Sequence, residues 1–196
     1  IKVLELDPDG DAAQNALERI YSQEGAWTTL IALYEKRAGL VHDESRRSDI
    51  LRRAARIAQA KLRDAAETAR LYERLHTYDP TDAEALDALE KHYDKNRDWQ
   101  KLVDVLRTKL AFTIEPTDTL PILARLARVY EEGQRDATHA IESYVKILEV
   151  DPVHREALEA LSRLYESTER WAELIEVTRR LIRLVTDRAQ KALLYF

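Results

Sequence analysis

The sequence predicts an all-α protein built from repeated pairs of antiparallel helices. Three observations carry this prediction: four landmarks recur at a constant step of 72 residues, apolar residues follow helical spacing between them, and the composition suits helix. Only four glycines and five prolines occur in 196 residues, whereas Ala, Leu, Glu and Arg dominate. The landmarks are Asp7-Pro8, Asp79-Pro80 and Asp151-Pro152; Leu17, Leu89 and Leu161; Tyr21, Tyr93 and Tyr165; and Trp27, Trp99 and Trp171.

The first 72-residue unit contains two predicted hairpins of different character. Helices over 9–23 and 27–40 form the first, after a segment 1–8 that reads as the tail of a preceding helix. Helices over 45–60 and 64–78 form a variant hairpin. Asp79-Pro80 ends it, because proline cannot continue a helix and disfavours helical geometry in the residue before it.

The same order of elements then repeats to the end of the chain. Further helices are predicted over 81–95, 99–113, 118–132, 136–149, 153–167 and 171–184. The chain is thus expected to be a single array of hairpins at 9–41, 42–80, 81–113, 114–152 and 153–186, with 187–196 as the start of another. Equivalent positions in successive hairpins lie 37, 35, 37 and 35 residues apart.

The hairpin length and its residues resemble the tetratricopeptide repeat (TPR) family, whose period is about 34 residues. The variant hairpin follows the TPR pattern at Leu126, Ala127, Tyr130, Gly133, Ala140, Tyr144, Ile147 and Pro152, with one extra residue in its turn. The Trp-bearing hairpins match it at Leu161, Ser162, Tyr165, Trp171 and Leu174, and depart from it at Glu18, Arg37, Glu90 and Lys109. The resemblance implies a right-handed α-solenoid that acts as a protein–protein interaction scaffold.

Two alternatives remain open at this stage. The run Ala69-Arg70-Leu71-Tyr72-Glu73-Arg74-Leu75 is similar to the second helix of a HAT repeat, which implies an RNA-processing scaffold. The equivalent run at 141–147 lacks its Ala-Arg and Glu-Arg pairs. The third interpretation is the regulatory arm of an enzyme whose catalytic domain lies outside this segment.

Composition argues against several classes of function. A net charge of −5 disfavours a general nucleic-acid binder, and the absence of cysteine removes disulfides and thiolate metal sites. The five histidines share no metal-ligand spacing, and the sequence has no phosphate-binding loop or nucleophile constellation. We therefore predict no enzymatic activity, no cofactor, no metal and no small-molecule substrate. The histidines are His42, His76, His92, His139 and His154.

The location of the protein is less constrained. No run of about 18 apolar residues is present, so membrane insertion is not expected, and we predict a cytoplasmic protein. The chain does not begin with Met and starts within a repeat, which suggests an excised piece and leaves open a targeting segment upstream of it.

The three tryptophans are predicted to be core residues. Each stands at the start of a second helix, and burial between the two helices of its hairpin would contribute a few kcal/mol. Their strict period favours a structural role over ligand stacking.

One column of residues is basic in all five hairpins. It lies two residues before the Tyr position of each first helix, about 200° around the helix from the packed Leu and Tyr stripe. In TPR proteins the exposed face of the first helix lines the concave groove, so the resemblance implies a basic ladder along that groove. We call Arg19, Arg56, Lys91, Arg128 and Arg163 the basic column.

Pairing within each helix divides the column. Asp87 and Glu159 precede Lys91 and Arg163 by four residues and are expected to pair with them. Arg52 and Ala124 stand at the equivalent places before Arg56 and Arg128, and Asp49 is expected to pair with Arg53. We therefore predict unpaired positive charge at Arg52, Arg56 and Arg128.

The predicted partner is another protein or a peptide segment, acidic or amphipathic. It is expected to bind the groove through Arg19, Arg52, Arg56, Lys91, Arg128 and Arg163. The apolar ends of the array, at Val3, Leu4 and Leu6 and at Leu193, Leu194, Tyr195 and Phe196, are a further candidate surface for self-association.

Overall fold

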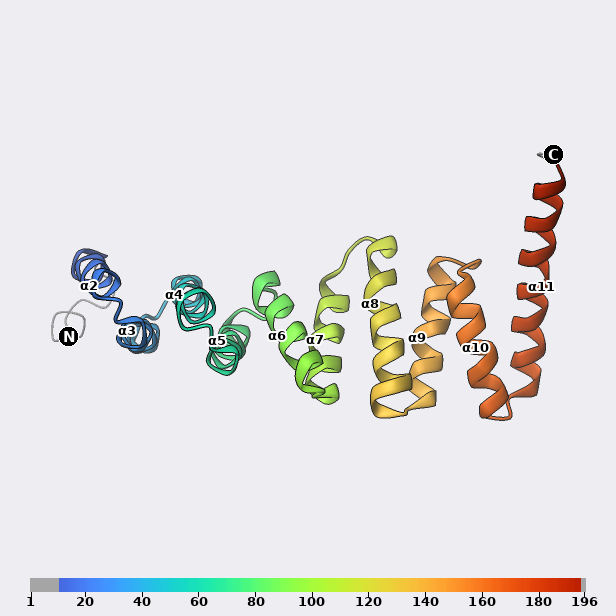
Figure 1. The fold of residues 1–196 in the computed structure, drawn as a ribbon, viewed down its shortest axis with the longest axis horizontal. Helices are drawn as coiled ribbons and strands as arrows, with labels where there is room; N and C mark the ends of the chain where they lie inside the picture. The colour runs from blue at the N-terminus through green and yellow to red at the C-terminus, as the bar shows by residue number, and fades with distance from the viewer. Residues whose placement is uncertain (1–10, 195–196) are drawn as a thin grey trace. The chain divides into compact units, whose positions relative to one another are not determined.

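The computed structural model describes the backbone of residues 11–194 and the side-chain surroundings of residues 15–185. Within this range it contains ten α-helices, two π-helices and no strand (Figure 1). The expected helix tail at 1–8 and the expected apolar ends of the array lie outside the described residues or side chains. The chain divides into two compact units, residues 1–96 and 97–196, which are described separately.

Unit 1 contains five α-helices and one π-helix in succession. Their order is α2 (Asp11–Glu24), α3 (Trp27–Leu40), α4 (Glu44–Ile57), η1 (Ala58–Leu62), α5 (Ala65–Tyr78) and α6 (Ala83–Asn96). Helix α3 packs on α4, α4 on α5, and α5 on α6, and Leu30, Leu51, Leu71 and Leu75 are fully buried in this unit.

Unit 2 begins with the second helix of a Trp-bearing hairpin and continues with helices in the same order as in unit 1. Its order is α7 (Trp99–Phe112), α8 (Pro116–Arg128), η2 (Val129–Gln134), α9 (Ala137–Val150), α10 (Arg155–Ser167) and α11 (Trp171–Leu194). Leu102, Leu106, Ile147 and Leu158 are fully buried in its core. The predicted all-α fold of repeated helices is confirmed, and most helix ends lie within two residues of those predicted.

The repeated Asp-Pro pair ends a helix by a defined set of hydrogen bonds. The N–H of Asp79 donates to the carbonyl of Leu75 at 2.9 Å and closes α5, and the Asp79 carboxylate accepts from the N–H of Thr81 at 3.1 Å. The same two bonds recur at Asp151, with Ile147 and Val153. The aspartate thus caps one helix and turns the chain over the proline toward the next.

The extra residue of the variant hairpin lies in a π-helix instead of a simple turn. Helices α4 and α8 each widen into a π-helix in their last turn, η1 and η2. Arg63 and Arg135, 72 residues apart, end the π-helices in left-handed geometry with φ of 55°. A π-helix accommodates one added residue without breaking the helix, so the insertion lengthens the end of the first helix.

Trp27 and Trp99 pack against the following hairpin, which corrects the prediction that all three tryptophans are buried within their own hairpins. The ammonium of Lys61 in η1 lies 5.1 Å from the ring centroid of Trp27, and the backbone of Gly133 in η2 lies against the indole of Trp99. Both rings are half-buried, whereas Trp171 is 56% exposed because nothing in the described chain covers that face of α11.

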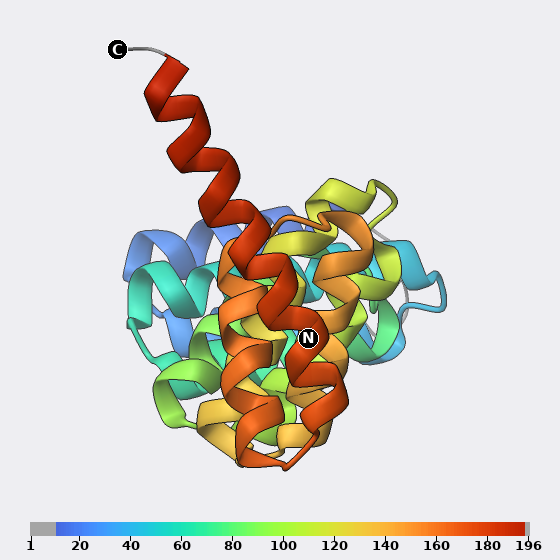
Figure 2. The same cartoon turned by 90° about the vertical axis from the view of Figure 1, so that its right-hand side faces the viewer.

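The last helix also differs from prediction. The sequence places the end of this helix at 184 and a new hairpin from 187, but α11 continues without interruption to Leu194. It extends beyond α9 and α10 in the same unit (Figure 2).

The contact between Gly133 and Trp99 generates a test of hairpin packing. A Cβ on Gly133 would lie 2.8 Å from Cδ2 of the indole, so Gly133→Ala should lower the free energy of unfolding by about 1–3 kcal/mol. Denaturant unfolding measures this, with Gly39→Ala as the control: an added Cβ there meets no atom within 4 Å, and alanine should add up to about 1 kcal/mol of helix stability. An equal stabilisation by both substitutions would contradict the described packing.

Candidate functional site

The basic column points to the surface, as its spacing predicts. All five members are exposed, whereas the landmark residues Leu89, Tyr93, Leu126, Leu161 and Tyr165 are buried. The column therefore lies on the outward face of the first helices, which we call the first-helix face. The residues that surround each member differ between the two units.

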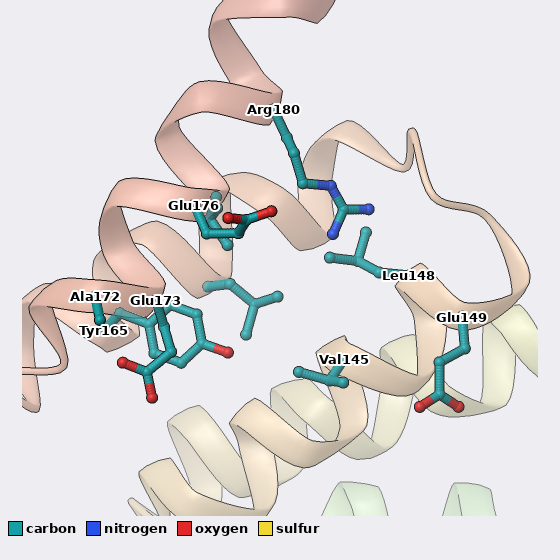
Figure 3. Close-up of a pocket in the computed structure, with 10 residues that line it drawn as sticks. Val145, Leu148, Glu149, Tyr165, Ala172, Glu173, Glu176 and Arg180 are labelled. Atoms are coloured by element: carbon teal, nitrogen blue, oxygen red, sulfur yellow. The ribbon is translucent and has the colours of Figure 1, made fainter.

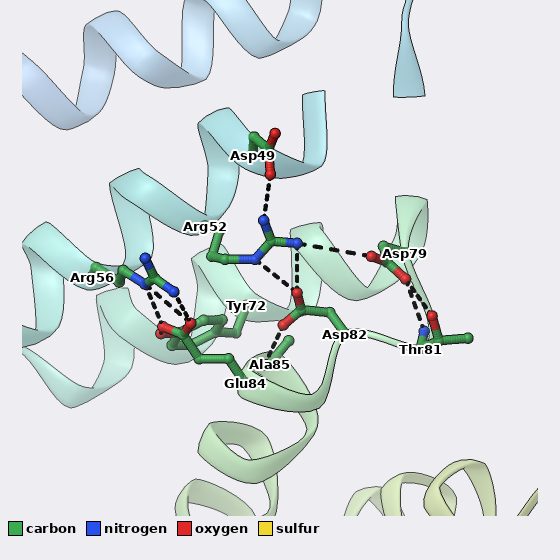
Figure 4. Close-up of polar contacts among 9 residues, drawn as sticks. All are labelled: Asp49, Arg52, Arg56, Tyr72, Asp79, Thr81, Asp82, Glu84 and Ala85. Atoms are coloured by element: carbon green, nitrogen blue, oxygen red, sulfur yellow. Dashed lines mark hydrogen bonds and ion pairs between the residues drawn. The ribbon is translucent and has the colours of Figure 1, made fainter. Parts of the chain in front are cut away.

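Arg52, beside the column in unit 1, is held by carboxylates of the next hairpin. Its Nε and Nη2 atoms lie 2.8 and 2.7 Å from Oδ2 of Asp82, and it also pairs with Asp49 on its own helix (Figure 4). The Asp82 side chain is only 7% exposed, and its other oxygen accepts from the N–H of Ala85 at 2.7 Å. Arg52 thus neutralises a nearly buried carboxylate that also caps α6.

Arg56 makes a second bridge to the same helix. Its Nε atom donates to both carboxylate oxygens of Glu84, at 2.8 and 3.0 Å, and the hydroxyl of Tyr72 donates to Oε1 at 2.8 Å. These bonds to the charged form, from Arg56 above all, lower the pKa of Glu84. Burial, together with the Glu84 carboxylate, raises the pKa of Tyr72.

The prediction that Arg52 and Arg56 are unpaired is therefore wrong. It considered only partners within one helix, four residues away, whereas Asp82 and Glu84 lie 30 and 28 residues further along the chain. The expected pair of Asp49 with Arg53 is replaced by the pair of Asp49 with Arg52. In unit 1 these two arginines hold successive hairpins together.

The equivalent place in unit 2 is open. Seventy-two residues after Arg52 and Asp82 stand Ala124 and His154, so the buried ion pair is absent there. A hollow of about 210 Å³ lies between α8 and α10, with Tyr144 and Ile147 of α9 beneath it. Its lining contains the two column members Arg128 and Arg163 and the carboxylates Glu131, Glu132, Glu156 and Glu159.

The arginines of this hollow are held more loosely than those of unit 1. Arg128 lies 3.7 Å from Glu156, and Arg163 lies 3.3 Å from Glu131, which also accepts from the Tyr144 hydroxyl at 3.0 Å. The side chains of Arg128 and Arg163 are 56% and 66% exposed. The expected pair of Glu159 with Arg163 is wrong, because Glu159 pairs with Arg155 at 2.6 Å. Burial and Glu131 raise the pKa of Tyr144 to about 12.

A second hollow in unit 1 carries a more uniform positive charge. It has a volume of about 320 Å³ and lies where η1, the start of α5 and α6 meet. Arg63, Lys91 and Lys95 line it, and none of them forms an ion pair with another described residue. Its one carboxylate, Asp64, is engaged as the cap of α5 through the N–H groups of Ala66 and Glu67. The walls include Ala65, Ala69 and Ala88.

Lys91 thus lies in the more basic of the two hollows, although it was expected to be paired on its own helix, unlike Arg52 and Arg56. The expected screening by Asp87 does not occur, because Lys91 pairs with no described residue. Arg63 and Lys95 were missed. Their signal was weak: Arg63 follows the predicted helix 45–60, and Lys95 ends the predicted helix 81–95. Arg19 is exposed on α2 and lines neither hollow.

Among the described side chains, no group of three or more His, Asp or Glu residues is arranged to hold a metal ion. In the same part of the chain, no helix combines the length and apolar character needed to cross a bilayer.

Similarity to known proteins concerns the repeat itself. A family profile described as tetratricopeptide repeat matches residues 14–48, 85–119 and 157–192, each of which contains one of the three tryptophans. No curated protein matches the sequence.

Among solved structures, two crystal structures of MamA are each 17% identical to this chain, with TM-scores of 0.51 and 0.52. The aligned regions cover 88% and 91% of this chain and 96% and 93% of theirs. A third structure, of MamA AMB-1, is 19% identical with a TM-score of 0.52, over 90% of this chain and 94% of its own. At such low identity the likeness extends to the fold alone.

The bond between Arg52 and Asp82 predicts a stability loss on truncation. Arg52→Ala should lower the free energy of unfolding by about 1–3 kcal/mol, because Asp82 loses its partner at a nearly buried position. Arg128→Ala, which removes an exposed contact of 3.7 Å, should change it by no more than about 0.5 kcal/mol. Chemical denaturation measures the free energy of unfolding of both variants. Similar losses in the two would show that the bond between Arg52 and Asp82 stabilises the fold no more than the exposed contact of Arg128 does.

Acid should destabilise unit 1 through Glu35 and Glu84. Bonds from Arg70 and Arg56 lower the pKa of these carboxyls below the ordinary 4.5, so the ionised forms stabilise the fold above that pH. That stabilisation is lost as the pH falls through the lower folded pKa values. Between pH about 6 and about 3, the free energy of unfolding should therefore fall more steeply with decreasing pH for the wild type than for Glu35→Gln/Glu84→Gln. Parallel curves would contradict the assignment.

Proposed function

Since the chain belongs to the tetratricopeptide repeat family, we propose that it is a protein–protein interaction module that docks an acidic segment of a partner on its first-helix face. A helical repeat array offers an extended surface for partners and no preformed catalytic cleft. The observation that carries the proposal is the hollow of unit 1, where Arg63, Lys91 and Lys95 lie together without internal partners.

The chemistry of this hollow suits carboxylates beside small apolar groups. Lys91 and Lys95 are four residues apart on α6 and project from the same side of the helix. With Arg63 they give three cations against one carboxylate, and Asp64 is occupied by two backbone N–H groups. A carboxylate that binds there gains charge-assisted hydrogen bonds without first displacing an internal ion pair.

The hollow of unit 2 provides a second contact of different character. Arg128 and Arg163 face four glutamates there, so the lining favours an amphipathic segment of mixed charge over a purely acidic one. Arg19 is a peripheral column member in this scheme. Arg52 and Arg56 act by joining hairpins, and contact with a partner would require their bonds to Asp82 and Glu84 to break.

The proposal is tested with a synthetic acidic peptide, rich in Glu and Ala, titrated into the protein at low and moderate salt. Lys91→Glu/Lys95→Glu should weaken binding by about tenfold or more, since two favourable charge contacts become repulsive. Lys146→Glu/Arg179→Glu applies the same charge change at exposed positions outside the hollow and should leave the affinity near that of the wild type.

Two outcomes would reject the proposal. Equal losses in both double variants would mean that the peptide senses net charge and not the hollow. Tighter, salt-dependent binding of a single-stranded RNA oligonucleotide, lost in Lys91→Glu/Lys95→Glu, would favour the HAT-like RNA scaffold instead.

A further inference from the structure

A third hollow lies on the opposite face of unit 2, where the second helices α9 and α11 flank α10. It has a volume of about 420 Å³. We call the almost completely buried Leu161 and Tyr165 of α10 its floor, and Val145, Leu148 and Val177 its apolar walls. Tyr165, Val145 and Leu148 are labelled in Figure 3. In unit 2, the first-helix face of the proposed function is lined by α8 and α10, so this hollow is a separate site.

The rim of this hollow is acidic. Glu149 on α9 and Glu176 on α11 are exposed and pair with no described residue. Glu173 also lines the rim and is held by Arg170 at 2.6 Å. The one cation in the lining, Arg180, donates a hydrogen bond to the carbonyl of Pro152 at 2.6 Å, which joins α11 to the turn that follows α9. The rim therefore presents negative charge around an apolar centre.

The internal repeat shows how this hollow arises. In unit 1, the hydroxyl of Tyr93 donates to Glu73 at 2.6 Å. Seventy-two residues later the tyrosine is kept as Tyr165, but the glutamate is replaced by Val145. Tyr165 is 6% exposed, and its hydroxyl points into the hollow without a hydrogen-bond partner among the described residues (Figure 3).

Other replacements at the same step change the surface in the same direction. His76 is replaced by Leu148 in the wall, while Thr77 and Lys101 are replaced by Glu149 and Glu173 on the rim. The walls of this copy are thus more apolar, and its rim more acidic, than the equivalent residues of the preceding copy. An internal hydrogen bond has been exchanged for an open apolar depression into which the Tyr165 hydroxyl points.

We propose that this hollow binds a basic amphipathic segment of a partner protein. An apolar side chain of Leu or Ile size fills the space beside Val145 and Leu148, and flanking Lys or Arg side chains pair with Glu149 and Glu176. A polar group of the bound segment accepts a hydrogen bond from the Tyr165 hydroxyl. The module then carries two docking faces of opposite charge preference in one chain.

Three peptides of about 16 residues serve as probes. The first is a helix-forming peptide with a Leu stripe and Lys elsewhere, the second replaces Lys by Glu, and the third replaces Leu by Ala. The wild-type chain should bind the first peptide at least about tenfold more tightly than the other two, because only the first combines apolar burial with charge complementarity.

The decisive variant is Val145→Glu, which restores the residue of the preceding copy. It should weaken binding of the Lys/Leu peptide by about tenfold although it adds a negative charge, because it occupies the hollow and offers Tyr165 an internal acceptor. Ile114→Glu adds the same charge at a residue that is 91% exposed and lies outside the hollow, so it should not weaken binding. Glu149→Gln/Glu176→Gln should weaken binding and reduce its dependence on salt.

Several results would overturn the inference. One is equal or tighter binding of the Lys/Leu peptide to Val145→Glu; another is equal binding of the acidic peptide to the wild type. If Val145→Glu does not fold, an unchanged affinity of Glu149→Gln/Glu176→Gln for the Lys/Leu peptide would also overturn the inference. Concentration-dependent self-association that Val145→Glu abolishes, without binding of any peptide, would identify a second copy as the occupant and reject the proposed one. Lys91→Glu/Lys95→Glu should bind the Lys/Leu peptide as tightly as the wild type does. A failure of the proposed function, which concerns the acidic peptide, can therefore be distinguished from a failure of this inference.

Discussion

Within each unit, neighbouring hairpins bury apolar residues against each other, and the rest of the structure depends on this contact. The π-helix η1 covers Trp27, η2 covers Trp99, and Trp171, which no described segment follows, is exposed. The aspartates and arginines between hairpins add directional bonds to this packing, as Arg52 and Asp82 do in unit 1. Stability in such an array is a sum of contacts between neighbours, so a local change at one junction leaves the others intact.

This independence lets the copies differ in surface while they keep one backbone plan. Left-handed residues occur at Gly25, Arg97 and Glu169, each separated by 72 positions, so the turn geometry is retained where the side chains are not. At one position an arginine that bridges two hairpins becomes Ala124, and at another a hydrogen-bonded glutamate becomes Val145. Each replacement removes an internal partner, and a hollow of unit 2 lies at each of the two places. The two hollows that we propose as docking sites carry opposite charge: the lining of the one in unit 1 is basic, and the rim of the one that contains Val145 in unit 2 is acidic.

The sequence predicted the helices and the exposed basic column because both follow from periodicity within one helix. It did not predict the partners of Arg52 and Arg56, since contacts across 28–30 residues depend on how hairpins stack. The π-helices were also missed, because one added residue can enter a loop or widen a helix, and spacing alone does not distinguish the two. The hollows could not be predicted for a related reason, because Arg63 and Lys95 lie near Lys91 only when three segments of the chain pack together.

The central claim is that two faces of one repeat array select partners of opposite charge. Amide chemical shifts recorded while the acidic peptide and the Lys/Leu peptide are titrated separately test it most directly. The account predicts that the acidic peptide shifts amides near 59–65 and 88–95, and that the Lys/Leu peptide shifts amides near 145–149 and 172–180. Shifts by both peptides on one common set of residues would contradict it.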